Sequence, residues 1–227
     1  MLLLPDHRHH RGPLSRVTGQ ERRSADRWCA PTVLGMDSST ATIAVIGTGR
    51  VGTAVGTALA AAGRRVVYGS RTPGDGRVGV AEALAESTVV LVAIPAEAVD
   101  GLAREHAAAL DGKLVLDATN GFGAGPANAA ATFAEHAPTA RYARAFNSLG
   151  AEAFADPTFD GAPADLFYSC AAADRAAVED LVVAVGLRPV FVGEGNHEVV
   201  DGVMRLWLTL AMGQGRGREF AFRIVDR

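Results

Sequence analysis

Three glycines at a fixed spacing stand between an apolar segment and a helix-forming segment. The sequence Gly47-Thr-Gly49-Arg-Val-Gly52 follows Thr42–Ile46 and opens the helix expected over 51–62. In such a turn the first glycine permits a tight bend, the second lets backbone approach a pyrophosphate, and the third lets the helix pack close to the strand. The helix N-terminus then offers free N–H groups and a positive dipole end to phosphate oxygens. The spacing and its context predict a dinucleotide-binding site.

The end of the second expected strand indicates which dinucleotide is bound. About twenty residues after the glycines, where an NAD site places a carboxylate, the chain has Ser70, Arg71 and Thr72, and the nearest downstream acid is Asp75. A carboxylate would repel a 2′-phosphate, whereas a hydroxyl and a guanidinium donate hydrogen bonds to its oxygens. The sequence therefore predicts NADP(H). The alternatives are a glycine turn without a ligand and an ordinary solvated arginine.

Apolar segments alternate with helix-forming segments from residue 40 onward, and together they would position this site. We expect strands over Thr42–Ile46, Arg65–Gly69, Val78–Val80, Thr88–Ile94, Lys113–Asp117, Tyr142–Phe146, Asp165–Cys170 and Arg188–Val192. We expect helices over 51–62, 81–86, 96–110, 172–185 and 199–212. Strands that are apolar throughout are buried on both faces, and their alternation with helices indicates a parallel sheet. The predicted fold class is α/β, a doubly wound parallel sheet of the NAD(P)-binding Rossmann type with a small α+β C-terminal appendage.

The chain divides into three predicted regions. Residues 1–39 show no periodicity and are expected to be a disordered extension, with Met36 as the true start of the protein. Residues 40–147 form the predicted NADP-binding domain. Residues 148–227 are short for a full second domain and are expected to form a small domain for the substrate or acceptor.

One connection departs from the usual Rossmann pattern. Six residues separate Arg71 from Val78, whereas a crossover that includes its helix needs at least about 10–12 residues. We therefore expect the second helix to be missing, the third strand to be a stub or absent, and the adenine side of the pocket to be more open.

The composition of the chain limits the kinds of molecule that we expect it to bind. The chain has 227 residues and a formal net charge of −3, without the basic excess that nucleic-acid binding requires. No apolar run reaches the roughly 18 residues of a membrane helix. Cys29 and Cys170 have neither disulfide nor metal spacing, and the histidines near the N-terminus (His7, His9 and His10) are more simply incidental than a metal site. We expect a cytoplasmic protein that acts on a small molecule, with no nucleic acid, membrane or metal.

Across residues 41–227 the chain resembles the NADPH-dependent reductases of the deazaflavin coenzyme F-420. The matching pieces are Gly47–Gly52, Gly69–Thr72, Ala93–Glu97, Asp117–Asn120, Ala145–Glu152, Gly186–Val190 and Gly213–Phe220, with Phe222 just beyond. The first two pieces occur in many NADP enzymes, and the ordered series is more specific. The resemblance implies direct hydride transfer between NADPH and the deazaflavin, a homodimer, and a small C-terminal domain that closes the deazaflavin pocket.

The resemblance also implies roles for particular residues. Thr48, Gly49, Arg50 and Val51 would line the pyrophosphate, within the turn bounded by Gly47 and Gly52. Ser70 and Arg71, next to Thr72, would hold the 2′-phosphate. Ala93, Ile94 and Pro95 would lie by the ribose and nicotinamide. Phe146 and Asn147 would face the nicotinamide or its partner, and Asn120 would also contact the cofactor. Phe146 is equally well explained as a core aromatic at a strand end.

No residue is predicted to act as a general acid or base, because the hydride donor and the hydride acceptor themselves supply the reactivity that the transfer requires. Three alternatives remain open. The first is an NADPH reductase with another acceptor, such as a flavin, a metal ion or an imine. The second is a non-catalytic NADP(H)-binding regulator, and the third is a degenerate paralogue without activity.

Overall fold

The computed structural model describes residues 41–123 and 125–227. The predictions for residues 1–39, including the start at Met36 and the three histidines, lie outside the described residues. All the described residues fall within one compact unit. None of the helices in this part of the chain has the length and apolar character needed to cross a bilayer.

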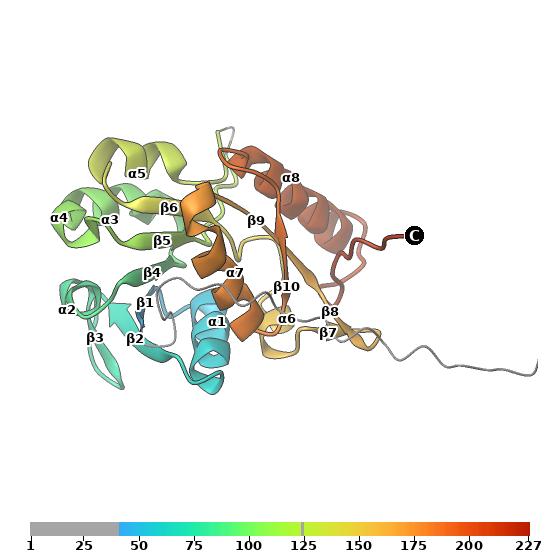
Figure 1. Cartoon of the computed structure of the whole chain (residues 1–227), viewed down its shortest axis with the longest axis horizontal. Coiled ribbons are helices and arrows are strands. Elements are labelled where there is room, and N and C mark those ends of the chain that lie inside the picture. Colours follow the sequence, from blue (N-terminus) through green and yellow to red (C-terminus); the bar gives the residue numbers. More distant parts are fainter. Residues whose placement is uncertain (1–40, 124) are drawn as a thin grey trace, which may run out of the picture. The chain divides into compact units, whose positions relative to one another are not determined.

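The expected strands form, and they join one sheet (Figure 1). Its strands are β1 (Thr42–Ile46), β2 (Arg65–Ser70), β3 (Arg77–Gly79), β4 (Val89–Val92), β5 (Leu114–Asp117), β6 (Arg141–Arg144), β9 (Asp165–Cys170) and β10 (Arg188–Phe191). Within the described residues the order of these eight strands is β10-β9-β6-β5-β4-β1-β2-β3. After β3 the chain crosses back to β4 on the other side of β1. The switch point at which doubly wound sheets bind ligands therefore lies between β1 and β4. The predicted fold class is confirmed.

One strand pair differs from the parallel expectation. β9 pairs antiparallel with β6, while the pairs from β3 to β6 and the β9–β10 pair are parallel. The chain between β6 and β9 carries only the short helix α6 (Glu152–Ala155) and a hairpin of β7 (Thr158–Phe159) and β8 (Ala162–Pro163). Without a crossover helix to carry the chain back along the sheet, β9 enters in the opposite direction.

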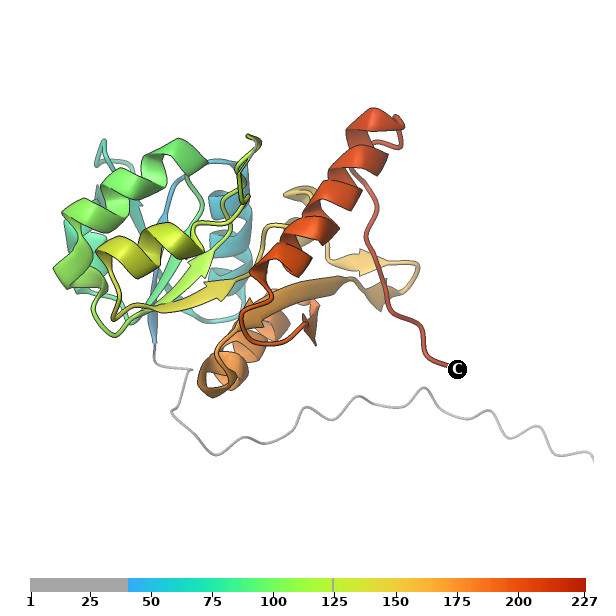
Figure 2. The ribbon, with the colours of Figure 1, turned by 90° about the horizontal axis from the view of Figure 1, so that it is seen from above.

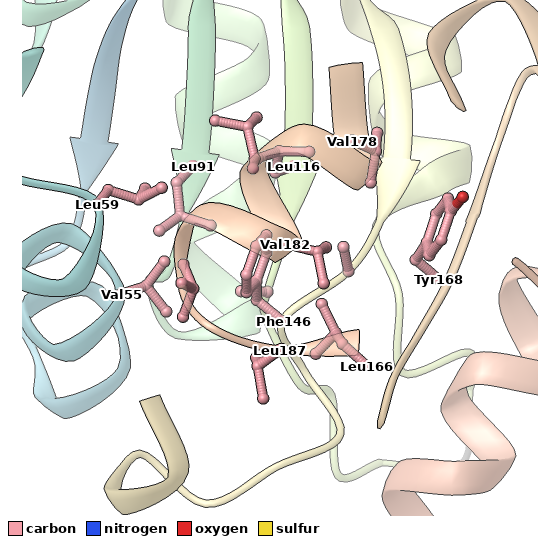
Figure 3. Packing of buried hydrophobic residues seen from close by; sticks show 14 of the residues in the cluster. Val55, Leu59, Leu91, Leu116, Phe146, Leu166, Tyr168, Val178, Val182 and Leu187 are labelled. Atoms are coloured by element: carbon pink, nitrogen blue, oxygen red, sulfur yellow. The ribbon is translucent and has the colours of Figure 1, made fainter. Parts of the chain in front are cut away.

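Helices cover both faces of the sheet (Figure 2). They are α1 (Arg50–Ala61), α2 (Val80–Ala85), α3 (Val99–Glu105), α4 (Ala107–Leu110), α5 (Ala130–His136), α7 (Arg175–Ala184) and α8 (His197–Leu208). Successive residues of β1 alternate between two cores, because side chains along a strand point to opposite faces. Ile43 and Val45 pack with α1 and α7, whereas Ala44 and Ile46 pack with α2, α3, α4 and α5. Figure 3 shows side chains of the first core, including Val55 from α1, converging on the sheet.

Three predicted helices are divided. The expected helix over 96–110 is a single 3-10 turn η2 (Ala96–Ala98), then α3 and α4, which are separated where His106 leaves helical geometry at φ −117° and ψ 20°. The expected helix over 199–212 becomes α8 followed by a π turn η4 (Thr209–Gly213). The helix over 172–185 likewise begins with a 3-10 turn η3 (Ala172–Asp174). Helices α5 and α6 and the β7–β8 hairpin were not predicted, because each is too short for a periodic signal.

The short connection after Arg71 is confirmed. β3 has only three residues, pairs parallel with β2 and leads directly into α2, so no helix lies between β2 and β3. The turn uses left-handed backbone at Gly74, Asp75 and Gly76. The boundary predicted after residue 147 stays a prediction; in the structure, β9 and β10 from beyond it extend the same sheet.

Candidate dinucleotide-binding site

The glycine turn after β1 has room for side chains at one position and none at the other two. A Cβ on Gly47, whose φ is 108°, would lie 2.3 Å from the carbonyl oxygen of Ala93. A Cβ on Gly52 would lie 2.0 Å from the carbonyl oxygen of Gly47, where helix α1 meets the turn. A Cβ on Gly49 would meet nothing within 4 Å. Packing therefore requires the outer two glycines, while the middle glycine borders free space that a ligand can use.

A cavity of about 630 Å³ lies at this turn. Its lining residues are Thr48, Gly49, Arg50, Thr53, Ala54, Ala151 and Glu152. No side chain caps the N-terminus of α1, so the free N–H groups of its first turn remain available to an anion. The cavity and the open position at Gly49 suit the pyrophosphate of a dinucleotide.

The predicted 2′-phosphate residues follow β2 on the surface. The Ser70 hydroxyl accepts a hydrogen bond from the Thr72 backbone N–H at 3.1 Å. Arg71 is exposed and, among the described residues, forms no ion pair within 4.0 Å. Its guanidinium is therefore available to a phosphate.

The predicted nicotinamide-side residues follow β4. Ala93 donates its backbone N–H to the Ile46 carbonyl at 2.9 Å, and its own carbonyl borders Gly47. Ile94 packs against the core beside α2 and α3, and Pro95 is exposed ahead of η2. The resemblance places Val51 at the pyrophosphate. The Val51 side chain packs against the core that contains α1 and α7, so its backbone is the part available to a ligand at the turn.

Phe146 and Asn147 follow β6 in different environments. The Phe146 side chain is fully buried in the core, with its ring centroid 6.0 Å from that of Phe154, and its φ of 61° is left-handed. This position agrees with the interpretation as a core aromatic, and contact of its ring with nicotinamide would require its neighbours to move. Asn147 is 4% exposed, and neither polar atom of its side chain has a hydrogen-bond partner among the described residues, as expected of an amide that a ligand completes.

A buried ionic network joins three elements beside this edge of the sheet. Arg144, at the end of β6, donates from Nε to Asp201 of α8 at 2.8 Å. Its Nη1 lies 3.2 Å from the carboxylate of Asp117, the last residue of β5. All three side chains are at most 2% exposed. Asn120 belongs to the network rather than facing open space, since it accepts from Arg144 Nη2 at 3.1 Å and donates to the Asn147 carbonyl at 3.1 Å.

Two titratable side chains border the network. Tyr142 donates its hydroxyl to Asp117 at 2.5 Å, and burial, with the Asp117 charge, raises the pKa of Tyr142. The His197 ring lies 4.9 Å from the Tyr142 ring, edge to face, and its Nδ1 is buried without a partner. Burial lowers the pKa of His197, which favours a neutral imidazole near pH 7.

Glu152 contributes a carboxylate to the cavity wall. It forms an ion pair with Arg50 and accepts from Arg218 Nε at 3.2 Å and 3.3 Å. A hydrogen bond from its own backbone N–H, and then the bond from Arg218, lower the pKa of Glu152. Within the described residues no group of three or more His, Cys, Asp or Glu side chains converges on a possible metal position.

Sequence reasoning missed Arg144, Asp201, Glu152 and Arg218 as members of these clusters. Arg144 carried a detectable signal, because a charged residue inside an otherwise apolar predicted strand needs a partner. Glu152 and Arg218 lie within segments that carry the family resemblance, but nothing in the sequence pairs them or Asp201 with their partners, which lie 57 or more residues away along the chain.

The fold and the glycine turn define an NAD(P)-binding Rossmann protein. Residues 42–121, from β1 to just after β5, match the family model described as NADP oxidoreductase coenzyme F420-dependent. The predicted resemblance is confirmed over that segment, which is similar in sequence to F420-dependent NADP oxidoreductases. No curated protein sequence matches the chain significantly.

Solved structures with the same fold differ in the reaction they serve. A proposed F-420-dependent NADP reductase from an Arthrobacter species is 23% identical with a TM-score of 0.70, and the match covers 82% of this chain and all of that one. A hypothetical protein from Sinorhizobium meliloti is 26% identical with a TM-score of 0.58, over 70% and 87% of the two chains. An Aspergillus terreus imine reductase in complex with NADPH4 and dibenz[c,e]azepine is 21% identical with a TM-score of 0.58, over 78% and 63%.

Proposed function

We propose that this protein transfers a hydride between NADPH and a deazaflavin, coenzyme F-420. The observation that carries the proposal is the match of residues 42–121 to the family, over a segment whose glycine turn borders an open cavity. The exposed Arg71 beyond β2 supports NADP(H) in preference to NAD(H).

Each part of the cofactor has candidate partners in this chain. The backbone of Thr48–Val51 would bind the pyrophosphate, together with the Arg50 side chain. Ser70, Arg71 and Thr72 would bind the 2′-phosphate. The segment Ala93–Pro95 would lie along the nicotinamide ribose. The unpartnered side chain of Asn147 offers both a donor and an acceptor, the combination that a carboxamide requires.

The chain's own contribution would be binding and orientation. When bound, NADPH supplies a hydride, and reduction of a deazaflavin takes up that hydride and one proton. The protein has to hold donor and acceptor about 3–3.5 Å apart and keep water away. The neutral state favoured for His197 agrees with a reaction in which no imidazolium delivers the proton.

The test mixes purified protein with NADPH and follows absorbance of the nicotinamide. Separate reactions contain F-420, free flavin mononucleotide, a cyclic imine, ferric ion or no acceptor. We expect oxidation of NADPH with F-420. Oxidation only with flavin, imine or ferric ion would replace the deazaflavin by that acceptor. Tight binding of NADPH without oxidation in any reaction would favour a regulator or an inactive paralogue.

We further propose a homodimer, as the resemblance implies, and a location in the cytoplasm, as the composition favours. Val199 and Leu206 of α8 are 53% and 51% exposed, and because they are seven residues apart they lie on one helix face. Such an apolar face supports helix contact with a second copy. Light scattering on the wild type and on Leu206→Glu tests this, with a dimer expected for the former and a monomer for the latter.

A further inference from the structure

Two arginines from distant parts of the chain share one carboxylate at the candidate pyrophosphate cavity. Arg50 begins α1 directly after the glycine turn, Glu152 begins α6, and Arg218 lies in the C-terminal segment. Both Glu152 and Arg50 line the cavity. The two arginines carry one positive charge more than the carboxylate neutralises, so the cluster as a whole attracts anions.

The C-terminal segment is held where it brings Arg218 to this cluster. The Arg218 guanidinium lies 5.3 Å from the centroid of the Trp207 ring. Trp207 of α8 donates its indole N–H to the Phe220 carbonyl at 3.1 Å, and the two rings stack with centroids 5.4 Å apart. A Cβ on Gly150 would lie 2.8 Å from Glu152 Oε2 and 3.2 Å from the Arg218 carbonyl. Packing therefore reserves space for Glu152 and Arg218 to meet.

We propose that Arg218 is a further nucleotide-binding residue, and that Glu152 holds Arg50 and Arg218 at the cavity until a pyrophosphate replaces the carboxylate as their partner. This inference rests on the proposed binding of NADP(H), and it is independent of the acceptor. Guanidinium groups bind phosphate and carboxylate oxygens with the same forked geometry. The arginines can therefore exchange one anion for the other, and the exchange ties the C-terminal segment to occupancy of the nucleotide site.

Two variants separate the roles of Glu152 and Arg218. Glu152→Gln keeps the shape and one acceptor oxygen but removes the charge that repels a pyrophosphate. We expect it to bind NADP⁺ about two- to fivefold more tightly, the range for partly exposed charges. Arg218→Ala loses a charge-assisted contact, and we expect about tenfold weaker binding. Calorimetry on the full chain measures both affinities.

The matched control is Glu86→Gln. Glu86 pairs with Arg65 at 2.9 Å, with side-chain exposures of 41% and 68%, close to the 35% and 71% of Glu152 and Arg50. Arg65 begins β2, at the opposite end of that strand from Ser70. We therefore expect unchanged affinity for NADP⁺.

Adenosine 2′-phosphate serves as a second probe, because it carries the 2′-phosphate without a pyrophosphate. We expect its affinity to be the same in the wild type, Glu152→Gln and Arg218→Ala. An equal loss of both ligands in Arg218→Ala would show a general structural effect and overturn the proposal.

The fluorescence of Trp207 tests whether the Arg218 guanidinium, which lies over the Trp207 ring, changes its partner when NADP⁺ binds. The chain has two tryptophans, so Trp28→Phe leaves Trp207 alone. Saturating NADP⁺ should change the Trp207 emission in this variant, and the change should disappear when Arg218→Ala is added. If the wild type fails to bind NADP⁺, the proposed nucleotide function fails. If it binds NADP⁺ but Arg218→Ala binds equally well, or Glu152→Gln binds no more tightly, only this inference is overturned.

Discussion

Asp201 is the residue through which α8 is anchored to the buried ionic network, and its removal has a predictable cost. Its Oδ1 accepts from Arg144 Nε at 2.8 Å and lies 2.7 Å from Nη2, and its Oδ2 accepts from Asn128 at 2.7 Å. Asp201→Ala removes all three interactions. Arg144 Nη1 and Nη2 retain acceptors at Thr119 and Asn120, whereas in the described part of the chain Nε has Asp201 as its one acceptor.

The expected loss of stability follows from these contacts. Removing one partner of a buried ion pair costs about 3–5 kcal/mol. The lower end applies, because the Asp117 carboxylate stays 3.2 Å from Arg144 Nη1 and still compensates its charge. With a urea slope of about 2 kcal/mol/M, a cost of about 3 kcal/mol lowers the unfolding midpoint by about 1.5 M. Asp201→Asn keeps one acceptor oxygen and should lose about half as much.

Urea titration followed by circular dichroism measures this effect. The control is Asp100→Ala, which breaks the contacts of an exposed carboxylate with Arg104 on α3 and His136 on α5 and should cost at most about 1 kcal/mol. If Asp201→Ala lost no more stability than Asp100→Ala, the network would not anchor α8, and the reasoning from burial would be refuted.

Four other predictions address the nucleotide site and the thiol. Arg71→Ala should weaken NADPH binding roughly tenfold and leave NADH binding unchanged; equal losses in calorimetry would contradict a 2′-phosphate contact. Gly49→Ala should keep the wild-type melting temperature but weaken NADPH binding more than tenfold, because its Cβ enters open space that the ligand needs. Gly52→Ala should instead lower the melting temperature, since its Cβ would lie 2.0 Å from a carbonyl oxygen of the turn. Burial raises the pKa of Cys170 to about 12, so this thiol should stay protonated at pH 8. In a Cys29→Ser background, Cys170 should therefore resist Ellman's reagent until urea unfolds the chain. Prompt reaction of the native protein would contradict this prediction.

Local sequence patterns predicted the strands of the main sheet and the fold class. β1, β4 and β5 are apolar apart from Thr42 at the start of β1 and Asp117 at the end of β5, because the sheet buries both their faces, and this property is visible in any short window of sequence. The glycine spacing predicted the turn because packing leaves no room for a Cβ at Gly47 and Gly52, while Gly49 borders free space. The length of the Arg71–Val78 connection predicted the missing helix, because a chain that short cannot cross the sheet.

The partnerships of distant charged residues were decided only by the tertiary structure. Arg50 and Glu152 are 102 residues apart, and Arg144 and Asp201 are 57 apart. No periodicity relates such positions, because their meeting depends on the order and direction of all the strands between them. The antiparallel entry of β9 has the same origin, since it follows from the absence of a crossover rather than from the residues of β9. The sequence by itself thus determined the Rossmann sheet with its glycine turn and predicted an NADP-type dinucleotide site there. The tertiary structure decided which charges surround that candidate site, because only packing brings separate segments within hydrogen-bonding distance.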